Sequence, residues 1–128
     1  MILTQRLPLR VVEVAAVVVY GMNGLMNLGI HLAATLVLIL QPNIKAIVDA
    51  IVAERPTFFT GIPSLFVALN TYHDIDKVDL TSIKAVFSGA APLPVEVMEK
   101  FEARTGVRIA EAYGMTEASS VTHVNPLK

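Results

Sequence analysis

Two things are scarce in this sequence: cysteine is absent, and only 16% of the 128 residues are charged. Without cysteine the chain has no disulfide, no thiolate metal site and no cysteine nucleophile, and a cytoplasmic location fits this composition. Ten basic residues face eleven acidic ones, and no basic stripe is present, which argues against a nucleic-acid partner. An apolar fraction of 54% is enough for the core of one domain.

Charge is also missing from one long segment, residues 14–44, which contains no Asp, Glu, Lys or Arg. About 20 apolar residues can cross a membrane. However, glycines and asparagines interrupt this run, and no basic cluster flanks it closely. We therefore expect a buried helix over residues 14–33, with His31 packed in it, followed by a buried strand. A membrane segment, either spanning or in peripheral contact, is the alternative.

Four short apolar runs predict β-strands. They cover residues 34–40, 56–61, 83–89 and 107–113. The first and the third are almost continuous in apolar and β-branched residues, which is typical of strands covered on both faces of a sheet.

Three segments between these strands have the spacing of amphipathic helices. They cover residues 44–55, 64–73 and 95–105. Asn43 is a suitable N-cap for the first helix, and a proline opens each of the other two. In the third helix we expect Val95, Met98 and Phe101 to form the buried stripe. The polar residues 71–82 predict a surface connection.

The alternation of strand and helix predicts an α/β fold with a parallel sheet and βαβ crossovers. In such sheets, ligands bind beyond the carboxyl ends of the strands. Three predicted strands run into loops of small and polar residues there, at 60–63, 88–92 and 113–117. We therefore expect these three loops to lie side by side at one edge of the sheet.

The loop over residues 88–92 reads SGAAP. Its small residues Gly89, Ala90 and Ala91 leave room for a flat ligand close to the backbone. The alternative is a plain turn from strand to helix, and these residues by themselves favour the turn.

The loop over residues 113–117 reads YGMTE. Tyr113 offers an aromatic face for stacking on a planar ring. The hydroxyl of Thr116 suits a phosphate oxygen, and Glu117 is a hard oxygen ligand that suits Mg²⁺. The alternative is that Thr116 and Glu117 cap a turn while Tyr113 belongs to the core.

Three stretches together resemble the adenylate-forming (AMP-binding) enzymes, in particular the long-chain fatty acid–CoA ligases. They are GIPSLF (61–66), FSGAAPLP (87–94) and EAYGMTEASSVTHVNP (111–126). The upstream stretch NGLMNLGIHLAATLVLI (23–39) looks like the same family. The resemblance implies a partial AMP-binding domain over residues 23–128, from the large N-terminal domain of such an enzyme, after a divergent stretch over residues 1–22.

The resemblance also implies a reaction and its cofactors: ATP, which yields AMP, together with Mg²⁺ and coenzyme A. In this reaction, the carboxylate of a fatty acid attacks the α-phosphate of ATP and releases pyrophosphate. The thiol of coenzyme A then displaces AMP from the acyl-adenylate.

Site residues follow from the same resemblance. The implied nucleotide-binding residues are Gly89, Ala90, Ala91, Pro92, Glu111, Ala112, Tyr113, Gly114, Met115 and Thr116. Thr116 and Glu117 are the implied catalytic residues, with Glu117 as the metal ligand. Gly61, Pro63 and Gly89 are implied to lie at the acyl pocket.

Parts of the family pattern do not occur in these residues. A phosphate loop ending in Pro-Lys-Gly is missing, and the ribose-binding aspartate and the catalytic lysine are expected beyond Lys128. Ser120 stands where a proline is common, and His123 is expected to have a surface or structural role. We therefore expect a fragment of a ligase with little or no activity by itself. The alternative is a non-catalytic apolar remnant that binds a membrane or a partner, and an exposed sheet edge would favour self-association.

Overall fold

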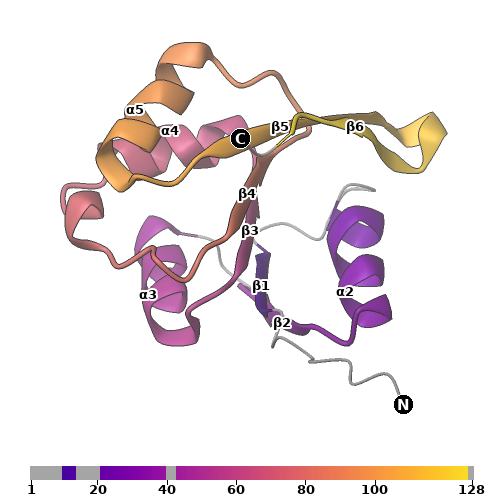
Figure 1. The fold of residues 1–128 in the computed structure, drawn as a ribbon, viewed down its shortest axis with the longest axis horizontal. Helices are drawn as coiled ribbons and strands as arrows, with labels where there is room; N and C mark the ends of the chain where they lie inside the picture. The colour runs from indigo at the N-terminus through magenta and orange to yellow at the C-terminus, as the bar shows by residue number, and fades with distance from the viewer. Residues whose placement is uncertain (1–9, 14–20, 40–42, 127–128) are drawn as a thin grey trace.

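A six-stranded sheet with helices on both faces forms the centre of the molecule (Figure 1). The computed structural model describes residues 10–13, 21–39 and 43–126. The strand order is β2-β1-β3-β4-β5-β6. The first five strands pair in parallel, and β6 pairs antiparallel with β5. The predicted α/β fold is therefore confirmed, with one antiparallel strand at an edge.

The chain alternates between strands and helices along most of its described length. The strands are β1 (Arg10–Glu13), β2 (Thr35–Leu38), β3 (Phe58–Gly61), β4 (Ala85–Ser88), β5 (Ile109–Met115) and β6 (Ser120–Val124). The helices are the π-helix η1 (Met22–Asn27), α2 (Leu28–His31), α3 (Ile44–Glu54), α4 (Pro63–Thr71), the 3₁₀ turns η2 (Ile75–Lys77) and η3 (Thr116–Ala118), and α5 (Val95–Thr105). Figure 1 shows α3, α4 and α5 on one face of the sheet and α2 on the other.

The four predicted strands and the three predicted amphipathic helices are all present, with ends that differ by a few residues. The expected cap of α3 is confirmed, because the Asn43 side chain accepts a hydrogen bond of 2.8 Å from the amide of Ala46. Two strands were not predicted. β1 has only four residues and a charged residue at each end, and β6 follows the polar loop at residues 113–117.

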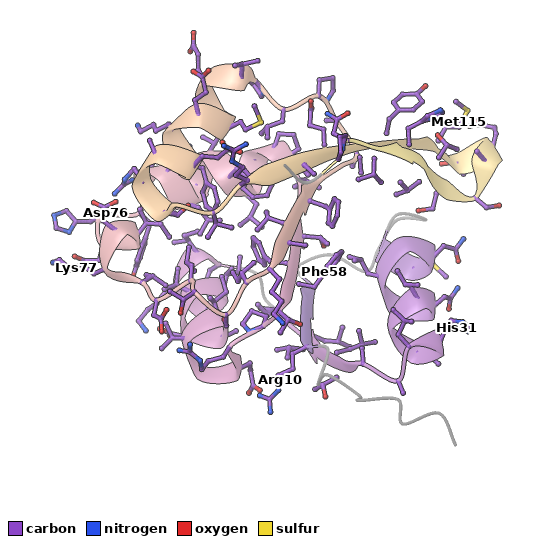
Figure 2. All side chains as sticks on the ribbon, in the orientation of Figure 1. Arg10, His31, Phe58, Asp76, Lys77 and Met115 are labelled. Atoms are coloured by element: carbon purple, nitrogen blue, oxygen red, sulfur yellow. The ribbon has the colours of Figure 1, made fainter. Side chains whose placement is uncertain are left out.

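The expectation for the apolar segment is partly wrong. Its residues 14–20 lie outside the described residues. The rest forms η1 and α2, which rest on the sheet through Gly29, where the Leu36 side chain of β2 packs so closely that it would have to shift to admit a Cβ. The other side of the segment faces outward: Ile30 is 66% exposed, and His31 is exposed rather than packed (Figure 2). Among the helices that the structure describes, none is long and apolar enough to cross a membrane.

Three smaller expectations about burial are also wrong. The connection over residues 71–82 is not confined to the surface, because Ile75 and Leu80 belong to the core. Val95 is exposed because it is the first residue of α5. β2 is an edge strand, so Leu38 is exposed instead of being covered on both faces of the sheet.

Aromatic rings connect the sheet to the helices beside it. Phe66 of α4 is fully buried and packs edge-to-face against Phe59 of β3 and Phe101 of α5, at centroid distances of 6.3 and 5.5 Å. Such pairs add to the apolar area that each ring removes from water. They hold α4 and α5 against the strands that lead to the loops at residues 60–63 and 88–92.

A charged contact on the surface joins the end of α3 to the segment before β4. The side chain of Asp79 accepts hydrogen bonds from the hydroxyl of Thr81 and from the guanidinium of Arg55. These two contacts, the hydroxyl first, hold the pKa of the Asp79 carboxyl well below its ordinary value. A carboxyl with a lowered folded-state pKa stabilises the fold above its unfolded-state pKa, and this stabilisation is lost as the pH falls.

We expect Asp79→Asn to destabilise the chain more at pH 7 than at about pH 3. The reason is that the contribution of the native carboxylate to the free energy of unfolding begins to decrease below about pH 4. Urea unfolding of both proteins at each pH measures the difference. Glu99→Gln, an exposed change on α5, is the control and should give the same small effect at both values. An Asp79→Asn effect that does not depend on pH would contradict this account.

Candidate functional site

The carboxyl ends of β3 and β4 lie next to each other and beside β5, which continues further, to Met115. Gly61 pairs with Ser88, and Ser88 pairs with Glu111, in parallel register. The amide of Gly89 donates a hydrogen bond of 3.2 Å to the carbonyl of Gly61 just beyond the pairing. The expectation of a shared edge is therefore confirmed for the loops at 60–63 and 88–92. It is only partly right for residues 113–117, because Tyr113, Gly114 and Met115 belong to β5 and Thr116 and Glu117 lie in the turn between β5 and β6.

A side chain of β5 holds the loop after β4. One carboxylate oxygen of Glu111 accepts a hydrogen bond of 2.9 Å from the amide of Leu93. Ala90 has a φ of +70°, a backbone conformation that alanine adopts at a cost of about 1 kcal/mol. The hydrogen bond and the buried Leu93 side chain hold the loop in this conformation, with Ala90 and Ala91 exposed at its outer side.

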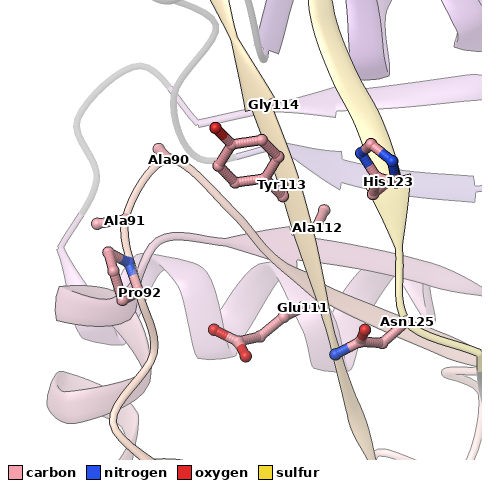
Figure 3. Close-up of a pocket in the computed structure, with 9 residues that line it drawn as sticks. All are labelled: Ala90, Ala91, Pro92, Glu111, Ala112, Tyr113, Gly114, His123 and Asn125. Carbon is pink, nitrogen blue, oxygen red and sulfur yellow. The ribbon is translucent and has the colours of Figure 1, made fainter.

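A cavity of about 410 Å³ lies between this loop and the β5–β6 hairpin (Figure 3). It is lined by Ala90, Ala91, Pro92, Glu111, Ala112, Tyr113, Gly114, His123 and Asn125. Figure 3 shows the loop on one side and the Tyr113 and His123 rings on the other. This volume falls in the range of small-molecule sites.

The hairpin depends on a glycine. Between Tyr113 and Gly114 the pairing of β5 with β6 shifts register, and a Cβ on Gly114 would overlap the backbone carbonyl of Ser120. Ser119 and Ser120 also have positive φ values, of 59° and 113°. Unfavourable conformations of this kind persist only where the surrounding structure enforces them.

The tip of the hairpin is tied to η1. The side-chain amide of Asn23 donates a hydrogen bond of 3.3 Å to the carbonyl of Ser119. Asn27, one turn further along, donates a hydrogen bond of 2.7 Å to the side-chain oxygen of Asn23. The unusual π-helical turn therefore supports the part of the hairpin that carries Thr116 and Glu117.

The predicted site residues fall into two groups. Seven of them line the cavity: Ala90, Ala91, Pro92, Glu111, Ala112, Tyr113 and Gly114. Gly89 is buried below the loop, beside Gly61 and close to the start of α4 at Pro63. Met115, Thr116 and Glu117 are exposed at the hairpin tip and do not line the cavity.

The chemistry of the cavity suits a flat, polar group without much charge. Its lining contains one carboxylate, one imidazole, one phenol and an amide, but no lysine or arginine. Small side chains and backbone groups provide the rest of the wall. Among the residues that the structure describes, no three His, Asp or Glu side chains cluster to hold a metal ion, so Glu117 offers a single carboxylate.

Sequence reasoning missed two residues of the cavity, His123 and Asn125. Both come from β6 and the residue after it, and His123 pairs with Tyr113 across the hairpin. The alternation of β-branched and polar residues in SVTHV after the polar turn is a strand pattern that could have revealed β6.

Comparison with known proteins gives a consistent picture. The sequence model of the family described as AMP-binding enzyme matches residues 12–128. A long-chain-fatty-acid–CoA ligase of Bacillus subtilis (strain 168) is 40% identical over 107 residues, which is 84% of this chain and 19% of the relative. A 4-coumarate–CoA ligase 3 of Arabidopsis thaliana is 34% identical over 104 residues, which is 80% of this chain and 18% of the relative. The chain thus spans about a fifth of the length of these relatives.

Solved structures share the fold. ATP-bound MatB from Rhodopseudomonas palustris superposes with a TM-score of 0.82 at 22% identity, over 92% of this chain and 23% of that one. A benzoate CoA ligase from Burkholderia xenovorans LB400 superposes with a TM-score of 0.81 at 24% identity, over 94% of this chain and 25% of that one.

We expect Gly114→Ala to open the β5–β6 hairpin, because the added methyl group would collide with the Ser120 carbonyl. Amide hydrogen exchange of residues 111–124 should become faster, and the cavity should lose its hairpin wall. Gly106→Ala is the matched control: φ is +71° there, but the space around it is open, so the change should cost about 1 kcal/mol and leave hairpin exchange unaltered. Unaltered exchange in Gly114→Ala would show that the hairpin does not need this glycine.

Proposed function

Because the chain belongs to the AMP-binding enzyme family, we propose that it is part of an ATP-dependent fatty acid–CoA ligase and forms the base-binding portion of its nucleotide site. One observation carries this proposal: the loop Ala90–Pro92 and the β5 segment Glu111–Gly114, which a helix separates in sequence, line a single cavity. The 40% identity to a long-chain-fatty-acid–CoA ligase supports it.

The cavity would hold the adenine and its ribose. Ala90 and Ala91 let a flat ring approach the backbone of the loop, and Tyr113 is 60% exposed, so its face is free to stack. Glu111 uses one carboxylate oxygen to hold Leu93 and keeps the other for a ligand donor. Stacking of this kind contributes about 1–3 kcal/mol per base.

The phosphates would lie toward the hairpin tip. Thr116 and Glu117 are exposed there, and their backbone forms the 3₁₀ turn that Asn23 supports through Ser119. The Thr116 hydroxyl would donate a hydrogen bond to an α-phosphate oxygen. Glu117 would be a carboxylate ligand of Mg²⁺. Proteins commonly bind this ion through one or two carboxylates, while phosphates and water supply the other ligands. When bound, Mg²⁺ would offset negative charge on the phosphates.

The reaction that we propose for the whole enzyme has two steps. A carboxylate oxygen bonds to the α-phosphorus of ATP, the bond to the bridging oxygen breaks, and pyrophosphate leaves. The sulfur of coenzyme A, after its proton is lost to solvent, then bonds to the acyl carbon, the bond from this carbon to the phosphate oxygen breaks, and AMP leaves. The residues of this chain would position the nucleotide for both steps. Gly61, Pro63 and Gly89 would lie beside the acyl group at the ends of β3 and β4.

The acid is proposed from similarity alone. The Bacillus relative is named for long-chain fatty acids and is more similar than the relatives named for 4-coumarate, at 40% against 34% identity or less. A fatty acid is therefore the substrate that we propose, and an aryl acid is the second candidate.

We propose that this chain supplies only part of the catalytic site of the enzyme. The alternative, a non-catalytic apolar remnant, applies to the chain when it is isolated. The chain spans about a fifth of the relatives' length, and no lysine or arginine lines the cavity to hold a triphosphate. A cytoplasmic location, peripheral membrane contact and self-association through an open sheet edge stay predictions.

We expect the 128-residue chain to release no measurable AMP from ATP, palmitate and coenzyme A. The reason is that transition-state charge on the phosphates needs cationic groups that the cavity lining does not supply. A coupled AMP assay measures this, with the full-length Bacillus ligase as the positive control. Robust turnover by the chain would show that it carries a complete catalytic site.

We expect the chain to bind AMP weakly and Tyr113→Ala to weaken that binding about tenfold, because the stacking ring is lost. Tyr113→Phe keeps the ring and should bind AMP nearly as the native chain does. Titration followed by ¹H–¹⁵N spectra measures both affinities and reports whether the shifts occur around Ala91 and Gly114. Equal affinity of Tyr113→Ala and the native chain would remove the proposed base site.

A further inference from the structure

His123 is part of the cavity wall although the three loops at the sheet edge do not include it. It lies on β6 directly opposite Tyr113, and the two ring centroids are 6.3 Å apart with an interplanar angle of 51°. Both rings line the cavity (Figure 3), and both side chains are exposed. A ligand that stacks on Tyr113 would therefore have the imidazole close to its edge.

The contacts of Thr122 allow either tautomer of neutral His123, and one of the two leaves Nε2 as the free acceptor. The Thr122 hydroxyl donates a hydrogen bond of 3.3 Å to the carbonyl of Tyr113. The same oxygen lies 2.9 Å from Nδ1 of His123. A hydroxyl has only one proton to donate, so when the Tyr113 carbonyl receives it, the oxygen must accept the proton of Nδ1. In the neutral ring, Nε2 is then an acceptor with a free lone pair.

Nε2 has no hydrogen-bond partner among the residues that the structure describes. Of the other polar groups in the wall, one Glu111 oxygen binds the Leu93 amide, and the backbone amide of Asn125 donates to the carbonyl of Glu111. An unused acceptor in the wall of a small cavity suits a ligand that brings a donor.

We propose that His123 contacts the bound nucleotide directly and that its Nε2 accepts a hydrogen bond from the nucleoside. This inference rests on the proposed function, since it names a further contact of the same site. Two groups of an adenine nucleotide supply the required donor: the exocyclic amine of the base and a hydroxyl of the ribose. The contact selects nucleosides that carry this donor over those that lack it.

Two variants separate direct contact from mere support of the Tyr113 ring. His123→Phe keeps an aromatic ring beside Tyr113 but has no acceptor. His123→Gln loses the ring but keeps an acceptor oxygen. We expect His123→Phe to bind AMP about three- to tenfold more weakly than the native chain, and His123→Gln to bind within about twofold of it. Because His123 is exposed, both variants should fold, and urea unfolding checks this.

Three ligands identify the donor. IMP has a carbonyl in place of the base amine, and 2′-deoxy-AMP and 3′-deoxy-AMP each lack one ribose hydroxyl. The ligand without the relevant donor should bind the native chain more weakly than AMP does, and His123→Phe should then add no further loss. If His123→Phe weakens all four nucleotides by the same factor, the side chain acts only through Tyr113 and the proposal is wrong.

The tautomer can be read without any nucleotide. A long-range ¹H–¹⁵N correlation spectrum of the free chain should show the proton of neutral His123 on Nδ1, and the Nε2 signal should move when AMP is added. A proton on Nε2 in the free chain would overturn the proposal. If the folded native chain does not bind AMP at all, the proposed function fails and this inference fails with it, whereas AMP binding that is unaffected in His123→Phe removes only the inference.

Discussion

The hydrogen bond from the amide of Leu93 to the carboxylate of Glu111 joins the two parts of the cavity. It connects the loop after β4 to the next strand of the sheet, and it holds Ala90 in a backbone conformation that alanine rarely adopts. The parallel register of β3, β4 and β5 makes this contact possible, because it brings Ser88 and Glu111 level at the same edge.

Much of this arrangement could be predicted from local patterns. Runs of apolar and β-branched residues gave β3, β4 and β5, and the prolines and asparagine before the helices gave their starting points. Since consecutive strands of such a fold pair in parallel, the position of the loops at one edge followed from their order. The cap of α3 at Asn43 also followed, because it depends only on residues three apart.

The parts that could not be predicted depend on contacts between distant residues. β1 is short and has a charged residue at each end, and only its position between β2 and β3 makes it an inner strand. Ile75 is buried because α5 and η2 meet, which no local pattern shows. His123 enters the cavity because β6 turns back along β5, and the positive φ values at Ser119 and Ser120 allow that reversal without any glycine at the turn.

The direction of β6 has a practical consequence for anyone who handles this protein. Because the strand runs back toward the sheet, the backbone returns to the cavity at Asn125, three residues before the last residue of the chain. Pro126, the next residue, is exposed. A fluorescent dye attached to a cysteine placed at Pro126 would therefore sit beside the cavity and report the arrival of an occupant, and the absence of any other cysteine makes the labelling specific.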